Sequence, residues 1–162
     1  MKNNMIKKLS KELISKGHSM IIPHTNYISR SEADLISVTK SGYWNEYEIK
    51  RSRQDFLAEI RAFNGTGNYS YAKYEKHDKI RKCKDGGSNN KIPNKFWLVT
   101  PPDLVEEKEI PNYWGHYIID GYDVIKNVKA SWIHKEKVDF KFMYRVGVNI
   151  TKRYWGDKDG DV

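Results

Sequence analysis

Two segments of alternating character, joined by a turn and followed at once by a helix start, constrain the fold of this chain most. Residues 33–38 and 43–50 each alternate with a period of two, and Ser-Gly at 41–42 is a turn signal. This pattern predicts two strands paired as one hairpin. Residues 52–55 read Ser-Arg-Gln-Asp, which is the spacing of a helix N-terminal cap, and apolar residues over 56–63 recur at helical spacing. Two strands and a helix in direct succession indicate an α/β fold.

The remaining elements are predicted from the same two periods. In chain order we expect a helix over 5–16 that Gly17 ends, a helix over 71–84, strands over 96–99 and 117–119, and a C-terminal helix with apolar positions from 138 to 150. Pro23 cuts off a brief apolar run at 20–22, and residues 24–31 read as a loop or irregular edge. The glycine-rich and polar stretch 85–90 is the strongest candidate for a mobile loop.

Length and composition indicate one folded domain over residues 1–162. Leu, Ile, Val and Phe make up about 22% of the chain and aromatic residues 13%, so large rings supply part of the core. A lone cysteine, Cys83, excludes an internal disulfide and a cysteine-based zinc site. The sequence has no signal-peptide run and no apolar stretch of membrane-spanning length, so we expect a soluble, cytoplasmic protein with no membrane partner. Abundant Lys, Asn, Ile and Tyr are typical of an A+T-rich genome, such as that of a phage.

Three residues of the predicted hairpin form the sharpest candidate site. Asp34 lies on the first strand, and Glu48 and Lys50 share one face of the second, where pairing can bring all three together. Two carboxylates held so close repel each other unless a cation lies between them, and hard oxygen ligands suit Mg²⁺ or Mn²⁺. A lysine beside such a metal can orient the attacking water and offset phosphoryl charge. A cross-strand ion pair on a solvated face is the plainer interpretation of the same residues.

The acid-x-Lys pattern also occurs twice elsewhere in this charged sequence, at 106–108 and 139–141. The first copy lies in an unpatterned charged stretch before Pro111, and the second lies where a helix is expected to begin. Neither copy ends a strand that is paired with an acid-bearing partner. We therefore treat both copies as accidental.

The sequence over residues 30–56 resembles the PD-(D/E)xK nuclease superfamily, in particular its small single-domain members related to the MmcB-like DNA-repair proteins. The match rests on Arg-Ser-Glu-Ala-Asp-Leu at 30–35 and Glu-Tyr-Glu-Ile-Lys-Arg-Ser-Arg-Gln-Asp-Phe at 46–56, and it extends more loosely to residue 101. Ala33 stands where the motif has proline, a position that varies in such families. The resemblance implies an αβ sandwich around a mixed sheet with a restriction-endonuclease-like core, which agrees with the order of the predicted elements.

The resemblance also implies roles for individual residues. Asp34 and Glu48 would bind the metal, the backbone carbonyl of Ile49 could add a ligand, and Lys50 would serve the attacking water. A helix-borne acid often completes these sites, and Glu12 is the matching candidate, with Glu32 second. An ordinary exposed helix glutamate is the competing interpretation of Glu12.

Basic residues near this site are candidates for contact with DNA phosphates. They are Arg51, Arg53, Lys73, Lys76, His77 and Lys79. A lysine-rich helix is also often merely solvated. The net charge of +8 suits a polyanionic partner. Two function classes therefore remain, a Mg²⁺-dependent or Mn²⁺-dependent nuclease acting on DNA and a basic DNA-binding module without chemistry. The sequence leaves open whether the protein forms a homodimer.

Overall fold

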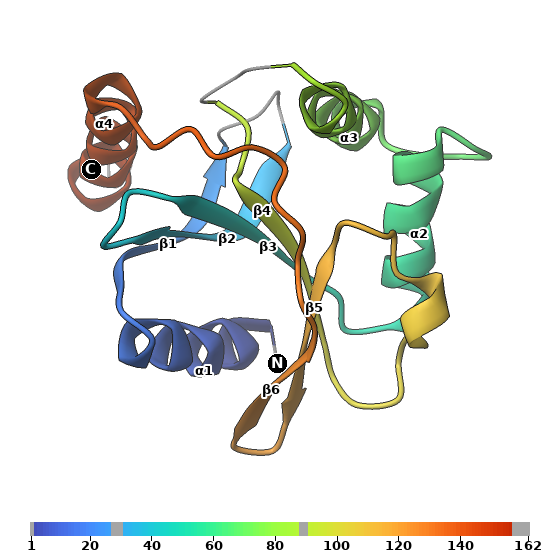
Figure 1. Cartoon of the computed structure of the whole chain (residues 1–162). Helices are drawn as coiled ribbons and strands as arrows, with labels where there is room; N and C mark the ends of the chain where they lie inside the picture. The colour runs from blue at the N-terminus through green and yellow to red at the C-terminus, as the bar shows by residue number, and fades with distance from the viewer. Residues whose placement is uncertain (1, 27–30, 88–90, 157–162) are drawn as a thin grey trace, which may run out of the picture.

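A six-stranded mixed sheet forms the centre of the molecule, with helices on both of its faces (Figure 1). The computed structural model describes residues 2–26, 31–87 and 91–156. In chain order the elements are α1 (Lys2–Ser15), β1 (His18–Asn26), β2 (Glu32–Thr39), β3 (Trp44–Ile49), α2 (Arg53–Asn64), α3 (Tyr71–Lys84), β4 (Lys95–Thr100), the 3-10 helix η1 (Glu107–Glu109), β5 (Gly115–Asp120), β6 (Asp123–Val128) and α4 (Phe140–Trp155). The strands follow one another from β1 to β6, parallel at β3–β4 and β4–β5 and antiparallel elsewhere. The predicted α/β sandwich is confirmed.

Neighbouring residues on the strands face opposite sides of the sheet and build two separate cores. On β2, Leu35 packs in one cluster with Leu9 and Leu13 of α1. The next residue, Ile36, packs in the other cluster with Phe56 of α2. Because successive side chains alternate across a strand, α1 covers one face of the sheet while α2 and α3 cover the other, as Figure 1 shows. Each face can therefore carry a site of its own.

The hairpin and the helix after it form as the sequence predicts. Strands β2 and β3 pair antiparallel, with Ile36 opposite Glu46. The Ser52 hydroxyl accepts a hydrogen bond from the backbone N–H of Asp55 at 3.1 Å, which satisfies one unpaired donor of the first turn of α2. Gly65 ends α2 with a φ of 67°, a left-handed conformation that glycine adopts without strain. The chain therefore passes from the end of β3 into α2 along a fixed path.

The prediction for residues 20–31 is wrong in its first half. β1 continues through Pro23 to Asn26, with Pro23 opposite Leu35 and Thr25 opposite Ala33. β1 is an edge strand, and an edge strand tolerates a residue that lacks an N–H because that group can face away from the sheet. Of the two predicted loops, residues 27–30 and 88–90 lie outside the described residues.

The C-terminal part combines a missed strand with a confirmed helix. β6 returns antiparallel to β5 through a turn that contains Gly121 at a φ of 53°, and Asp-Gly is a hairpin signal that the prediction overlooked. α4 begins after Asp139, whose carboxylate accepts the backbone N–H of Phe142 at 2.7 Å. Gly147 does not interrupt it. None of the helices in the described part of the chain has both the length and the apolar character needed to cross a lipid bilayer.

Candidate active site

Pairing of β2 with β3 brings Asp34 next to Glu48. The register joins Leu35 with Tyr47 and Ile36 with Glu46, so one further step sets Asp34 opposite Glu48. At that step a side chain takes the place of a backbone hydrogen bond between the strands, because Asp34 Oδ2 accepts the backbone N–H of Ile49 at 2.8 Å. Asp34 and Glu48 are 5% and 2% exposed, so two carboxylates are buried side by side.

Lys50 extends from the end of β3 into the same group. Its backbone N–H donates to the carbonyl of Val99 on β4 at 2.9 Å, which fixes the residue beside the sheet. Its ammonium donates to Glu48 Oε2 at 3.1 Å and to Glu59 Oε2 at 2.6 Å. The structure therefore brings together the three residues that the hairpin argument selected.

Two acids of this group were not among the predicted site residues. Glu59 lies on α2, fully buried, and its carboxylate binds Lys50, Lys73 and His77 at 2.6 Å each. Glu46 lies on β3 on the same face as Glu48. The signal for Glu59 was available, since it occupies the apolar stripe of α2 between Phe56 and Ile60, where an acid must find buried partners.

The expected row of phosphate-facing residues on α3 does not exist, and this corrects the prediction for Lys76 and His77. Both side chains are buried against the sheet. Lys76 donates to Glu46 Oε1 at 2.8 Å and to Glu48 Oε1 at 2.5 Å. The reason is helical spacing, because Lys76 and His77 share one stripe of α3 with the buried Ile80.

We call this group the acid–lysine cluster. Its members are Asp34, Glu46, Glu48, Lys50, Glu59, Lys73, Lys76, His77 and, at its mouth, Lys2. Burial lowers the pKa of His77, although the hydrogen bond and charge of Glu59 act to raise it. The lowered pKa favours the neutral ring. Four carboxylates then face four ammonium groups. The cluster is electrically balanced, as buried charges must be.

The pKa values of the two neighbouring carboxylates, Glu48 and Asp34, are shifted in opposite directions. Burial alone would raise the pKa of Glu48, but the ammonium groups of Lys76 and Lys50 outweigh it and lower this pKa to about 2. The pKa of Asp34 is raised, first by burial and then by the charge of Glu48, against the opposing effect of Lys2. Burial would lower the pKa of Lys50, but Glu48 and Glu59 raise it. Glu48 is therefore a fixed anion, and Asp34 is the carboxylate that gains most from a further cation.

The structure does not bring Glu12 to this cluster, which corrects its candidacy as the third acid. α1 points its N-terminus at the cluster, so Lys2 reaches Asp34 Oδ1 at 2.5 Å. Glu12 lies ten residues further on, about 15 Å along the helix axis, and pairs with Lys16 at 2.6 Å. The second candidate, Glu32, precedes Asp34 by two residues on the same face of β2.

Glu32 and Asp34 form a second ligand group with His24. His24 follows Pro23 on β1 and is opposite Asp34 by register, and its Nδ1 lies 3.1 Å from Glu32 Oε1. Ligand atoms of the three side chains lie within 4.8 Å of one another. Asp34 thus stands between Glu48 on one side and the pair of His24 and Glu32 on the other.

Asp34 and Glu48 offer oxygen ligands of the type that a hard divalent cation takes, and both oxygens of each already have hydrogen-bond or ion-pair partners. Mg²⁺ is usually bound through one or two carboxylates and completes its shell with water and phosphate. Lys2, whose side chain is 35% exposed, holds the Asp34 oxygen that such an ion would use, and a lysine at the helix end can swing away. The ligand role of the Ile49 carbonyl remains a prediction.

The other four residues predicted to contact phosphates differ in their exposure and in their partners. Arg51 is exposed after β3. Arg53 instead joins α2 to η1 by donating to Glu109 and to the carbonyl of Leu104. Lys73 is partly exposed while it binds Glu59, and Lys79 is exposed beside Glu75. Arg51, Arg53 and Lys79 are thus the three members of the set with exposed side chains outside the cluster, and Arg53 is held by Glu109.

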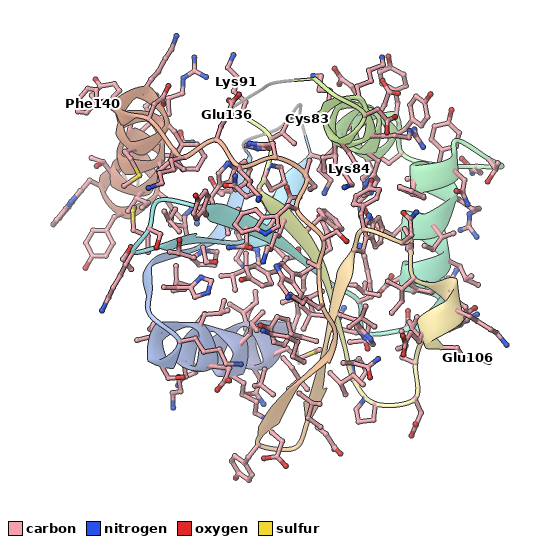
Figure 2. The ribbon with its side chains drawn as sticks, in the orientation of Figure 1. Cys83, Lys84, Lys91, Glu106, Glu136 and Phe140 are labelled. Carbon is pink, nitrogen blue, oxygen red and sulfur yellow. The ribbon has the colours of Figure 1, made fainter. Side chains whose placement is uncertain are left out.

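Neither further copy of the acid-x-Lys pattern lies on a strand. Glu106, just before η1, binds Lys108 at 2.6 Å, and both side chains are exposed. Glu106 lies at the outer edge of the molecule (Figure 2). Asp139 caps α4, and Lys141 lies exposed in its first turn. Their treatment as accidental copies agrees with this placement.

Comparison with known proteins adds a fold likeness. No family model and no curated protein matches the chain. Among solved structures, the SPO1766 protein of unknown function from Silicibacter pomeroyi is similar, with a TM-score of 0.60 over 98% of this chain and 92% of that chain. The sequences are 14% identical, so the likeness concerns the fold alone.

Proposed function

We propose that this protein is a metal-dependent nuclease that hydrolyses phosphodiester bonds in DNA and belongs to the PD-(D/E)xK superfamily. One observation carries the proposal: Asp34 is buried opposite Glu48 on the neighbouring strand, with the Lys50 ammonium 3.1 Å from Glu48 Oε2. Asp34 has the partly exposed Lys2 as its cationic partner, and its pKa is raised by burial and by the charge of Glu48. A divalent cation between the two carboxylates would therefore stabilise their ionised forms.

In this proposal the two carboxylates bind the metal and Lys50 acts on the attacking water. A divalent cation held by Asp34 and Glu48 would supply a metal-bound hydroxide and polarise the phosphate. Lys50 is held by Glu59 in a protonated state beside that position, so it orients the attacking water and offsets the charge that develops on the phosphate. Because the cluster is balanced before the cation binds, a substrate phosphate helps to restore neutrality. Metal and DNA should therefore strengthen each other's binding.

The test compares two buried acids that share one lysine. Glu48 and Glu46 both accept hydrogen bonds from Lys76, but only Glu48 lies opposite Asp34. We expect Glu48→Gln to lose Mg²⁺-dependent cleavage of labelled linear, nicked, branched or single-stranded DNA by about 10³-fold, since a metal ligand is removed. Glu46→Gln should stay within about tenfold of the parent.

Further variants separate chemistry from folding and from binding. Lys50→Ala should lose cleavage while it keeps metal-free DNA affinity, and Lys108→Ala and Lys141→Ala serve as controls with parental rates. Melting temperatures show which variants fold. An absence of metal-dependent cleavage on every DNA form, or parental cleavage by folded Lys50→Ala, contradicts the nuclease proposal.

A basic DNA-binding module is the second candidate function, and one observation favours it. Both oxygens of Glu48 already accept hydrogen bonds from lysines, as they would in a purely structural network. Such a module would bind DNA through phosphates, with an affinity that falls steeply as salt rises, and would not cut it. Binding without cleavage in the assay above identifies this case.

A further inference from the structure

A cavity lies on the face of the sheet opposite the acid–lysine cluster, at the other end of β3. It has a volume of about 590 Å³ and is bordered by the end of α1, the β2–β3 turn and strands β4 to β6. Asn45, at the start of β3, lines it, whereas Glu48 near the end of the same strand belongs to the acid–lysine cluster. Side chains of odd and even positions on β3 face opposite sides, so the two sites do not share a surface.

Aromatic rings form the floor and the rim of this cavity. On the floor, the rings of Tyr47 and Trp97 stack with an interplanar angle of 13°, and Tyr117 follows at 4.8 Å from Trp97. On the rim, Tyr43 and Trp132 meet edge to face with centroids 4.9 Å apart, and Trp132 is 36% exposed. Exposed ring faces at the mouth of a cavity are suited to stacking on a planar ligand.

Lysines surround these rings, and none of the described residues that line the cavity carries a carboxylate. Lys95 lies 4.3 Å from the ring centroid of Trp132, and Lys126 lies 5.7 Å from that of Trp97. Among the ion pairs between described residues, none includes Lys40, Lys95 or Lys126, whereas Lys16 is paired with Glu12. We call this site the lysine–aromatic pocket.

The lysine charges around the pocket contribute to lowered pKa values of two groups that line it. The pKa of Lys95 is lowered by burial and by the charges of Lys129 and Lys126. The pKa of His18, which also lines the cavity, is lowered by burial and then by Lys126, Lys16 and Lys95. Cations that repel one another in a partly buried site are stabilised when an anion binds between them.

We propose that the lysine–aromatic pocket binds a nucleotide, with its base stacked on the partly exposed rim ring of Trp132 and its phosphate held by Lys95 and Lys126. Rings alone would suit any apolar ligand and lysines alone any anion, but a nucleotide joins an aromatic base to a phosphate within one ligand. The volume lies in the range of small-molecule sites. The nucleotide is either free or an unstacked unit of a nucleic-acid strand. This inference does not depend on the proposed nuclease activity.

The test measures binding of AMP to the full chain by calorimetry and by the quenching of tryptophan fluorescence. We expect AMP to bind at least tenfold more tightly than adenosine or inorganic phosphate, because each of these lacks one half of the recognised chemistry. Lys95→Ala and Lys126→Ala should each weaken AMP binding at least tenfold, while the exposed Lys141→Ala on α4 leaves it unchanged. Lys126 is exposed on β6, so its removal should leave the fold intact.

A 5′-phosphorylated thymidine tetranucleotide distinguishes the two sources of the ligand. Competition between the tetranucleotide and AMP indicates a strand as the source, and binding of AMP alone indicates a free nucleotide. The proposal is overturned if neither probe binds at millimolar concentration, if both lysine variants bind AMP as the parent does, or if inorganic phosphate binds as tightly as AMP. DNA cleavage by Lys126→Ala, measured in parallel, shows that failure here and failure of the nuclease proposal are separate outcomes.

Discussion

The acid–lysine cluster and the lysine–aromatic pocket lie on opposite faces of one sheet, and both contain buried or half-buried lysines. In the cluster, Lys76 is fully buried between two carboxylates, and its pKa is raised by Glu46 and Glu48 although burial alone would lower it. In the pocket, Lys95 has no carboxylate partner among the described residues, and its pKa is lowered by burial and by neighbouring lysines. The difference lies in the counter-charge. The cluster supplies its own, whereas the pocket leaves this role to a ligand.

This contrast also explains where the net charge of the protein resides. A balanced cluster contributes nothing to the total of +8, so the excess of cations belongs to the rest of the surface. A basic surface around a balanced, desolvated site is suited to a polyanion that approaches along the surface and reaches the cluster at its mouth near Lys2.

Removal of a lysine should affect the two regions very differently. Lys76→Met leaves Glu46 and Glu48 buried without their partner, so we expect a loss of about 3–5 kcal/mol in the free energy of unfolding. Lys95→Met in the pocket removes no ion pair and should change stability by less than about 0.5 kcal/mol. Urea unfolding of the two variants and the parent measures both values. Equal losses would contradict the contrast between the cluster and the pocket.

Acid should weaken the cluster through Glu48. Its pKa is lowered in the folded state to about 2, below the ordinary value of 4.5, so the stabilisation that it provides is present above about pH 4.5 and disappears as the pH falls towards 2. The shift corresponds to about 3 kcal/mol. The difference in unfolding free energy between the parent and Glu48→Gln should therefore shrink across this interval, as chemical denaturation at several pH values can show. A difference that is constant with pH would mean that Glu48 titrates normally.

The pocket should respond to the loss of a cation by a small shift in a neighbouring pKa. Lys126 is one of the charges that lower the pKa of His18. Lys126→Ala should raise this pKa towards 6.5, and Lys141→Ala should not. An NMR titration of the His18 ring measures it. A pKa that stays the same in both variants would show that solvent already screens these charges.

The sequence predicts the centre of the candidate site better than its surroundings. Alternation over 33–50 is enough to bring Asp34, Glu48 and Lys50 together, because strand register is local information. Glu59 and Lys76 reach the same place through the packing of α2 and α3 on the sheet, which no local pattern specifies. Their position on buried helical stripes was a signal, but Glu59 was not selected and Lys76 was interpreted as a phosphate contact or a solvated charge because the sheet beneath them was not known.

Two other misses have the same origin. Glu12 was selected for its residue type, but the direction of α1 across the sheet places Lys2 rather than Glu12 at Asp34. The pocket combines rings and lysines from distant segments, such as Tyr43 and Trp132, and the tertiary fold brings these together.

A divalent cation bound between Asp34 and Glu48 is the central claim of this account, and anomalous diffraction from crystals soaked in Mn²⁺ tests it most directly. We predict a manganese peak at coordination distance from one oxygen of each carboxylate, about 2.1 Å for an ion of the Mg²⁺ type, with the Lys2 ammonium moved off Asp34. The peak should be absent in crystals of Glu48→Gln. A parent structure with no peak at this position, and with Lys2 still bound to Asp34 at high Mn²⁺ concentration, would contradict the claim.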